Sequence, residues 1–223
     1  MPGQPTDALG QNFRRAGLAS LLGVSAMGLD LYCVALPWYQ SWHRFALSLS
    51  VLALYLLLWR ASAKTLGLRL RPAQGLWYWA RLTLWLGVIV VIFSLAAFLI
   101  LSWGFGVHLP MTSMFRSEAY MWSWLFTACL TAPLMEEALY RLMLCPPLLA
   151  LGGRWLAIFV SGALFGLLHF RYGNPGPDNF IAGYLLAWAF VKSQSILVPI
   201  FLHSAGNFAV FCVHWYLFYW PIA

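Results

Sequence analysis

Two adjacent glutamates interrupt an apolar region of the chain. Glu136 and Glu137, followed by Arg141, lie in the segment PLMEEALYRLMLCPP, residues 133–147. The surrounding sequence has the composition of membrane-buried helix, and a charge at bilayer depth costs at least ~2.5–3.5 kcal/mol on insertion scales. Packing alone gives no reason to place two carboxylates side by side there. We therefore interpret this segment as a functional site.

Within a helix the two glutamates have different neighbours. Glu137 and Arg141 are four residues apart and share a face, so they can form an ion pair, whereas Glu136 shares a face with Tyr140. A purely structural ion pair would explain Glu137 and Arg141 but not Glu136. The spacing predicts one anchored carboxylate, Glu137, and one less constrained carboxylate, Glu136.

Two further apolar segments carry polar groups at helical spacing. Phe165 and His169 are four residues apart in one segment, and His203 and Asn207 are four apart in the other. A single intramembrane histidine more often binds a backbone carbonyl, but three helices that each contribute such a group indicate a shared site. Counting ~1.5 Å per residue from the expected cytoplasmic helix ends places Glu136, His169 and His203 near mid-membrane.

These side chains have two chemical uses. Glu136 and His169 can polarise a water molecule, while His203 and Asn207 donate hydrogen bonds to the oxyanion that forms when this water attacks a carbonyl. Alternatively, a glutamate and two histidines can bind zinc, as they do in some hydrolases. The sequence has no HExxH pattern, which makes zinc the weaker option.

The composition predicts the elements that must position these groups. Of 223 residues, 62% are hydrophobic and 9% are charged, with a mean hydropathy of +0.77, whereas a soluble domain has about a quarter charged residues. We expect an all-α polytopic membrane protein, a bundle of seven to eight transmembrane helices around a polar intramembrane cavity. Runs of about 20 apolar residues give the expected spans 16–37, 43–60, 80–103, 118–145, 154–170, 180–194 and 196–220; a further short helix in 104–117, or a split of the fourth span, would make eight.

The basic residues predict the orientation and exclude one class of partner. The net charge of +7 is dispersed over short loops and does not form the basic stripe of a nucleic-acid-binding surface. Arg14 and Arg15 precede the first span, and the densest basic cluster follows the second span. By the positive-inside rule both face the cytoplasm. The basic cluster after the second span consists of Arg60, Lys64, Arg69 and Arg71. We divide the chain into a polar N-terminal tail, 1–15, and a single transmembrane domain, 16–223.

A few other residues predict local structure. Asp30, inside the first span, is expected to pair with an arginine or another polar group of the bundle rather than to react. Prolines 146–147 should end the fourth span because proline cannot donate the helical hydrogen bond. Glycines 152–153 are interpreted as a turn, and the glycines at 162–166 as a site of close helix packing.

The three spaced motifs resemble the CPBP family of intramembrane endopeptidases. This family includes the type II CAAX prenyl endopeptidases and bacterial Abi relatives implicated in bacteriocin processing and self-immunity. Its pattern is EExxxR, FxxxH and HxxxN on successive membrane helices, and all three occur here in that order within residues 133–207. The resemblance implies no metal or other cofactor. It assigns water activation to Glu136 and His169, the oxyanion hole to His203 and Asn207, and support of the site to Glu137 and Arg141. From the residues themselves we expect Tyr140 either to line the pocket on the Glu136 face or to pack in the core, and Phe165 to shape the cavity rather than to react.

The resemblance also implies a function. We expect a metal-independent, glutamate-type intramembrane endopeptidase that cleaves near the C-terminal tail of membrane-tailed protein or peptide substrates within the lipid bilayer. The expected location is the bacterial inner (plasma) membrane with a cytoplasmic N-terminus, and the expected substrates are C-terminal sorting tails or prenylated CAAX tails. Two alternatives from other classes are a non-catalytic scaffold that binds membrane tails and a proton-coupled transporter. The transporter is less favoured because the sequence shows no paired repeat.

Overall fold

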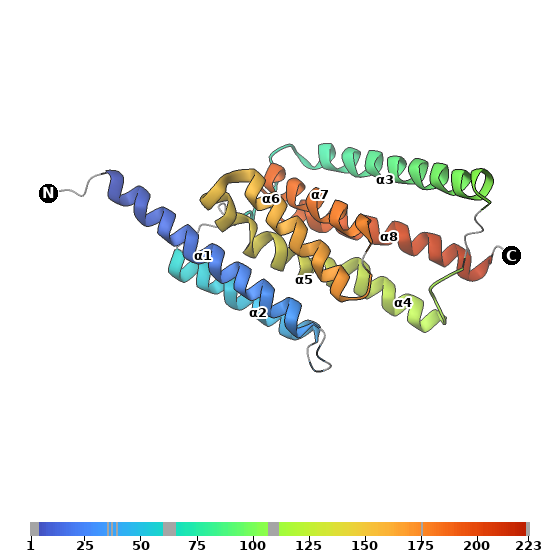
Figure 1. Cartoon of the computed structure of the whole chain (residues 1–223), viewed down its shortest axis with the longest axis horizontal. Coiled ribbons are helices and arrows are strands. Elements are labelled where there is room, and N and C mark those ends of the chain that lie inside the picture. The colour runs from blue at the N-terminus through green and yellow to red at the C-terminus, as the bar shows by residue number, and fades with distance from the viewer. Residues whose placement is uncertain are drawn as a thin grey trace. The chain divides into compact units, whose positions relative to one another are not determined.

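The all-helical architecture is confirmed by a computed structural model, which describes residues 5–34, 36, 38, 40–59, 66–106, 112–174 and 176–221 (Figure 1). Over these ranges the chain forms helices and connecting segments without a β-strand. Four helical segments of this part of the chain are long and apolar enough to cross a membrane, namely Arg14–Cys33, Leu76–Gly104, Cys145–Arg171 and Leu197–Tyr219. A shorter apolar helix covers Trp42–Leu57. The chain is an integral membrane protein, and seven to eight crossings remain a prediction.

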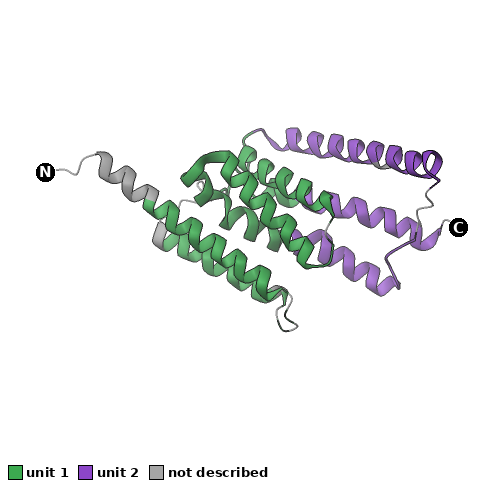
Figure 2. Cartoon of the chain, viewed as in Figure 1, with its two compact units in different colours: residues 1–73, 134–200 green, residues 74–133, 201–223 purple. Residues whose placement is uncertain are grey.

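Two compact units alternate along the sequence (Figure 2). Unit 1 comprises residues 1–73 and 134–200, and unit 2 comprises residues 74–133 and 201–223. Glu136 and His169 belong to unit 1, whereas His203 and Asn207 belong to unit 2. The residues predicted to activate water and those predicted to form the oxyanion hole are thus contributed by different units.

Unit 1 begins with a helical hairpin. Helices α1 (Pro5–Cys33) and α2 (Ser41–Leu54) lie side by side, and the π-helical segment η1 (Tyr55–Trp59) continues α2 (Figure 1). Helix α1 starts well before the expected boundary at residue 16, so most of the segment expected to be a polar tail is helical. Pro5 suits this start, because the missing N–H of a proline has no helical partner in the first turn anyway. Two residues of the predicted basic cluster, Arg60 and Lys64, lie outside the described residues.

Helix α6 (Cys145–Arg171) forms the centre of unit 1. It packs against α1 and, more extensively, against α7 (Pro177–Ser193). A Cβ atom added to Gly183 of α7 would lie 2.6 Å from the carbonyl oxygen of Gly162 in α6. The two backbones therefore approach as closely as glycine permits, which confirms the close packing predicted at residues 162–166.

Helix α6 begins earlier than the expected fifth span, 154–170. The helix is kinked at Gly152 and Gly153, where φ is −143° and +77°, which confirms the predicted turn. The residues that precede this kink, from Cys145 onward, are also helical, whereas the expected span began at residue 154. Pro146 and Pro147 explain the difference: a proline ends a preceding helix but is well suited to the first turn of the next one.

The segment with the paired glutamates alternates between α-helical and π-helical turns. It runs through α4 (Glu118–Phe126), η3 (Thr127–Thr131), α5 (Ala132–Glu137) and η4 (Ala138–Met143). The Ser117 hydroxyl caps its start by accepting a hydrogen bond from the Tyr120 N–H at 3.2 Å. The EExxxR motif crosses the junction between α5 and η4, and π-helical turns are frequent at functional sites.

Unit 2 contains α3 (Leu76–Leu99), the π-helical continuation η2 (Ile100–Gly104), α4 with η3, and most of α8 (Leu197–Tyr219). Phe211 of α8 packs with Met121 of α4 and with Phe115 in a small apolar core. Near this core the Ser113 hydroxyl donates a hydrogen bond to the His214 carbonyl at 2.8 Å. Residues 113–115 of the expected segment 104–117 therefore contact α8, and none of residues 112–117 is helical.

Candidate active site

The predicted ion pair between Glu137 and Arg141 is confirmed. Arg141 Nε lies 3.0 Å from Glu137 Oε2, and both side chains are fully buried. The guanidinium group also donates a hydrogen bond to the Gly183 carbonyl of α7 at 3.3 Å and lies 4.7 Å from the centre of the Phe165 ring. Arg141 thus connects η4 to both α6 and α7, and Glu137 neutralises its buried charge.

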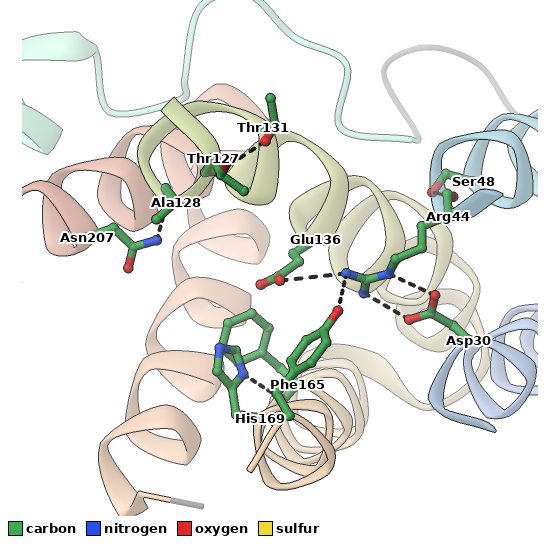
Figure 3. A network of polar contacts seen from close by, with 11 residues as sticks. Asp30, Arg44, Ser48, Thr127, Ala128, Thr131, Glu136, Phe165, His169 and Asn207 are labelled. Atoms are coloured by element: carbon green, nitrogen blue, oxygen red, sulfur yellow. Dashed lines mark hydrogen bonds and ion pairs between the residues drawn. The ribbon is translucent and has the colours of Figure 1, made fainter. Parts of the chain in front are cut away.

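Glu136 has an ion-pair partner on α2. Its Oε1 atom lies 3.8 Å from Nη1 of Arg44, and 6% of the glutamate surface is exposed (Figure 3). This distance is longer than a hydrogen bond of about 3 Å, so Arg44 attracts the carboxylate without fixing it as Arg141 fixes Glu137. The two distances match the predicted division between an anchored and a less constrained carboxylate.

Arg44 is itself fixed by Asp30 of α1. Its Nε donates a hydrogen bond to Asp30 Oδ1 and its Nη2 donates one to Asp30 Oδ2, each at 2.9 Å, so the contact is bidentate (Figure 3). The Asp30 side chain is fully buried and that of Arg44 nearly so. The prediction that Asp30 pairs with an arginine is confirmed, and charge-assisted pairs of this geometry are among the stronger polar contacts in proteins.

Tyr172 extends this network toward His169. It is the first residue after α6, and its hydroxyl accepts a hydrogen bond from Arg44 Nη1 at 2.8 Å. Burial raises the pKa of the Tyr172 phenol to about 12, although the nearby Arg44 charge opposes the shift. The Tyr172 ring stands edge-on to the His169 ring, with centroids 6.4 Å apart. Arg44 and Tyr172 therefore connect Glu136 to His169 through successive contacts.

The orientation of His169 follows from its own helix. Its Nδ1 atom lies 3.1 Å from the Phe165 carbonyl oxygen, one turn earlier in α6. Because a carbonyl can only accept, Nδ1 carries a proton in this contact, and in the neutral ring Nε2 is then the hydrogen-bond acceptor. The Phe165 ring lies 4.6 Å from the His169 ring and 5.5 Å from the fully buried Tyr140 ring. Phe165 thus packs between Tyr140 and the histidine.

His203 and Asn207 lie one turn apart on α8 in unit 2, and both are half-buried. The Asn207 side-chain amide donates a hydrogen bond of 2.6 Å to the carbonyl oxygen of Ala128 in the π-helical segment η3 (Figure 3). This bond fixes the rotation of the amide. An asparagine amide has two N–H groups, so a second donor remains for a ligand.

Sequence reasoning missed two members of the network. Arg44 lies within an expected apolar span, so the rule that selected Glu136, a charge at membrane depth, would have selected it too. Tyr172 lies in a turn-rich segment that gave no such signal. Among the described residues, no group of three or more His, Cys, Asp or Glu side chains is placed to hold a metal ion.

Comparison with known proteins identifies one family. Residues 118–209 match the family model described as type II CAAX prenyl endopeptidase Rce1-like, and this segment contains all three motifs. Asp30 and Arg44 lie outside it. No curated protein and no solved structure matches the chain. The family consists of intramembrane CAAX-type proteases, which act on membrane-associated proteins. The region that carries the paired glutamates is thus similar to the Rce1-like type II CAAX prenyl endopeptidases, and this match agrees with the resemblance to the CPBP family predicted from the motifs.

Proposed function

We propose that the protein is a metal-independent, glutamate-type intramembrane endopeptidase that cleaves a peptide bond near the membrane-associated C-terminal tail of its substrates. The observation that carries this proposal is the unequal environment of the paired glutamates. Glu137 is fully buried and held at 3.0 Å by Arg141, whereas Glu136 lies 3.8 Å from Arg44 in a network that leads to His169. Of the two glutamates, Glu136 has the longer ion-pair distance, and its partner Arg44 leads through Tyr172 to the His169 imidazole.

The chemistry assigned to unit 1 is activation of water. Glu136 and the unprotonated Nε2 of His169 accept hydrogen bonds from one water molecule and remove a proton as its oxygen attacks the peptide carbonyl. The carbon–nitrogen bond then breaks, and the same proton is delivered to the leaving amine. The products are a new carboxylate and a new amino terminus, so no external oxidant, reductant or nucleotide is consumed.

The chemistry assigned to His203 and Asn207 is stabilisation of the oxyanion. The Asn207 amide is held by the Ala128 carbonyl and retains a second N–H, as a preorganised donor requires. His203 precedes it by one turn of α8. Removing a single oxyanion-hole donor typically lowers kcat about 10²–10³-fold, so this pair would supply a large part of the rate enhancement.

The proposed substrates are membrane proteins with short C-terminal tails. Two observations support this substrate class: the chain has helices that can span a bilayer, and the matching family acts on membrane-associated proteins. We propose the bacterial inner membrane as the location, with a cytoplasmic N-terminus because Arg14 and Arg15 precede the first apolar segment. C-terminal sorting tails are the first substrate class to test and prenylated CAAX tails the second.

Mass spectrometry of tailed substrates tests the function. We expect purified wild type in detergent to generate a new terminus in a membrane-tailed protein, with no loss of rate in the presence of a chelator, because the proposed chemistry uses only protein side chains. The matched control is Glu136→Ala.

Three other outcomes would contradict the proposal. Cleavage that stops in chelator would support the zinc alternative, in which Glu136, His169 and His203 are ligands. Equal cleavage by wild type and Glu136→Ala would exclude the assigned base. Tight tail binding by both proteins without any new terminus would support the scaffold function.

A further inference from the structure

The polar network around Glu136 extends beyond the segment that matches the family. Asp30 on α1 and Arg44 on α2 both precede residues 118–209. Even so, both are almost completely buried, and Arg44 contacts Glu136. A buried ion pair between α1 and α2 requires only that each charge neutralise the other. The guanidinium group of Arg44 also makes contacts outside this pair, because its third nitrogen, Nη1, lies near Tyr172 and Glu136.

The contacts of Arg44 divide its guanidinium group into two sides. Asp30 occupies Nε and Nη2, at 2.9 Å each, and so fixes the plane of the group. The remaining nitrogen, Nη1, then has a defined direction: it donates to the Tyr172 hydroxyl at 2.8 Å and lies 3.8 Å from Glu136 Oε1. Two oxygens, one from α5 and one from the turn after α6, therefore flank one nitrogen of the charged guanidinium group.

Tyr172 makes the second connection. Its backbone N–H donates to the Leu168 carbonyl at 3.0 Å, and the Asn174 N–H donates to the His169 carbonyl at 2.9 Å, so the turn after α6 is attached to the helix end that carries His169. The phenol is protonated at neutral pH, because even an ordinary tyrosine has a pKa of about 10 and burial raises the pKa of Tyr172 further. Having accepted the Arg44 N–H, the hydroxyl still has its own proton to donate to an oxygen beside it.

We propose that Arg44, fixed by Asp30, is a positioning residue. It holds the Glu136 carboxylate at a defined position relative to His169, and Tyr172 links Arg44 to the histidine. The inference rests on the proposed function, since Glu136 is the assigned base. It adds two helices outside the family match to the catalytic apparatus. The role assigned to Arg44 is to place Glu136 and not to react, and a misplacement of about 1 Å can lower a catalytic rate roughly 10²-fold.

Kinetic variants give the first test. Arg44→Lys keeps one positive charge but cannot contact Asp30 with two nitrogens and Glu136 with a third, so we expect kcat to fall roughly 10²-fold with KM nearly unchanged. Tyr172→Phe removes one hydroxyl and should lower kcat roughly 10-fold. The matched control is Arg154→Lys, because Arg154 is exposed and lies over the Trp155 ring. This control should keep wild-type kcat and KM.

A charge swap separates positioning from helix pairing. The double variant Asp30→Arg with Arg44→Asp retains an ion pair between α1 and α2 but places a carboxylate beside Glu136. If Arg44 positions Glu136, thermal stability recovers relative to Arg44→Asp alone while kcat stays low. Recovery of both stability and kcat in the swap would overturn the inference, as would wild-type kcat in Arg44→Lys. Should the swap fail to fold, Arg44→Lys and Tyr172→Phe decide the question.

An infrared measurement tests the same inference without catalysis. The carboxylate stretching band of Glu136 is the band lost in Glu136→Gln, and we expect its frequency to shift in Arg44→Lys but not in Arg154→Lys. If no substrate is cleaved by wild type, the proposed function fails while this band still reports the placement of Glu136. An unchanged band in folded Arg44→Lys would overturn the positioning role, whatever the function proves to be.

Discussion

Glu136→Gln is expected to lower peptide cleavage roughly 10²–10⁴-fold, the range attributed to a general base, while the variant folds like wild type. Glutamine keeps the shape of the side chain but cannot accept the proton of the attacking water. Folding should persist because Arg44 retains its two bonds to Asp30 and its bond to Tyr172 when the Glu136 charge is removed. The measurement is the rate of new-terminus formation, with tryptophan fluorescence as the folding check.

Glu137→Gln provides the matched comparison one residue away. This substitution has the same chemistry but removes the carboxylate that neutralises Arg141, so it should lower stability more than Glu136→Gln does. The activity that remains per folded molecule should exceed that of Glu136→Gln. If instead Glu137→Gln were folded and inactive while Glu136→Gln cleaved normally, the two roles would have to be exchanged.

Arg141→Met is expected to produce the largest loss of stability, about 3–5 kcal/mol, because it leaves the Glu137 carboxylate buried without its positive partner. The substitution also removes the hydrogen bond to the Gly183 carbonyl and the contact with Phe165, which together join η4, α6 and α7. Methionine retains much of the apolar volume of the arginine chain, so the loss reports charge and hydrogen bonding rather than a large cavity. Thermal unfolding in detergent measures it.

A double-mutant cycle separates the pair from its surroundings. Replacing both members, Glu137→Gln with Arg141→Met, removes the uncompensated charge, and we expect this protein to be more stable than Arg141→Met alone. Arg69→Met, at a half-buried site in the connection before α3, is the control for loss of one positive charge. Equal stabilities of Arg141→Met and wild type would show that the buried pair does not hold these helices together.

The sequence alone was sufficient to predict several of the helices and the ion pair between Glu137 and Arg141. Long apolar runs identify helices because a bilayer-spanning segment must satisfy its own backbone hydrogen bonds, and α3, α7 and α8 accordingly fall close to the expected spans. The ion pair of Glu137 with Arg141 follows from helical periodicity alone. Contacts within one turn require no knowledge of how helices pack, and for that reason they are the most predictable part of the site.

Contacts between helices were less predictable. Glu136 meets Arg44 from a helix far away in the sequence, and no spacing rule selects one arginine of an apolar chain over another. The expectation that Asp30 pairs with an arginine was correct in type but could not name the residue. The π-helical turns around the glutamates, η3 and η4, also escaped prediction, because an extra residue in a helical turn leaves no clear signature in composition.

The most direct test of water activation by Glu136 is a single turnover in H₂¹⁸O with enzyme in excess over a cleavable membrane-tailed substrate. If Glu136 acts as a general base, one ¹⁸O atom appears in the new carboxyl terminus and the enzyme peptide that contains Glu136 acquires none. If Glu136 were instead a nucleophile that forms an acyl intermediate, hydrolysis at its own carboxyl carbon would place ¹⁸O in that peptide. Label in Glu136 would contradict the proposed mechanism.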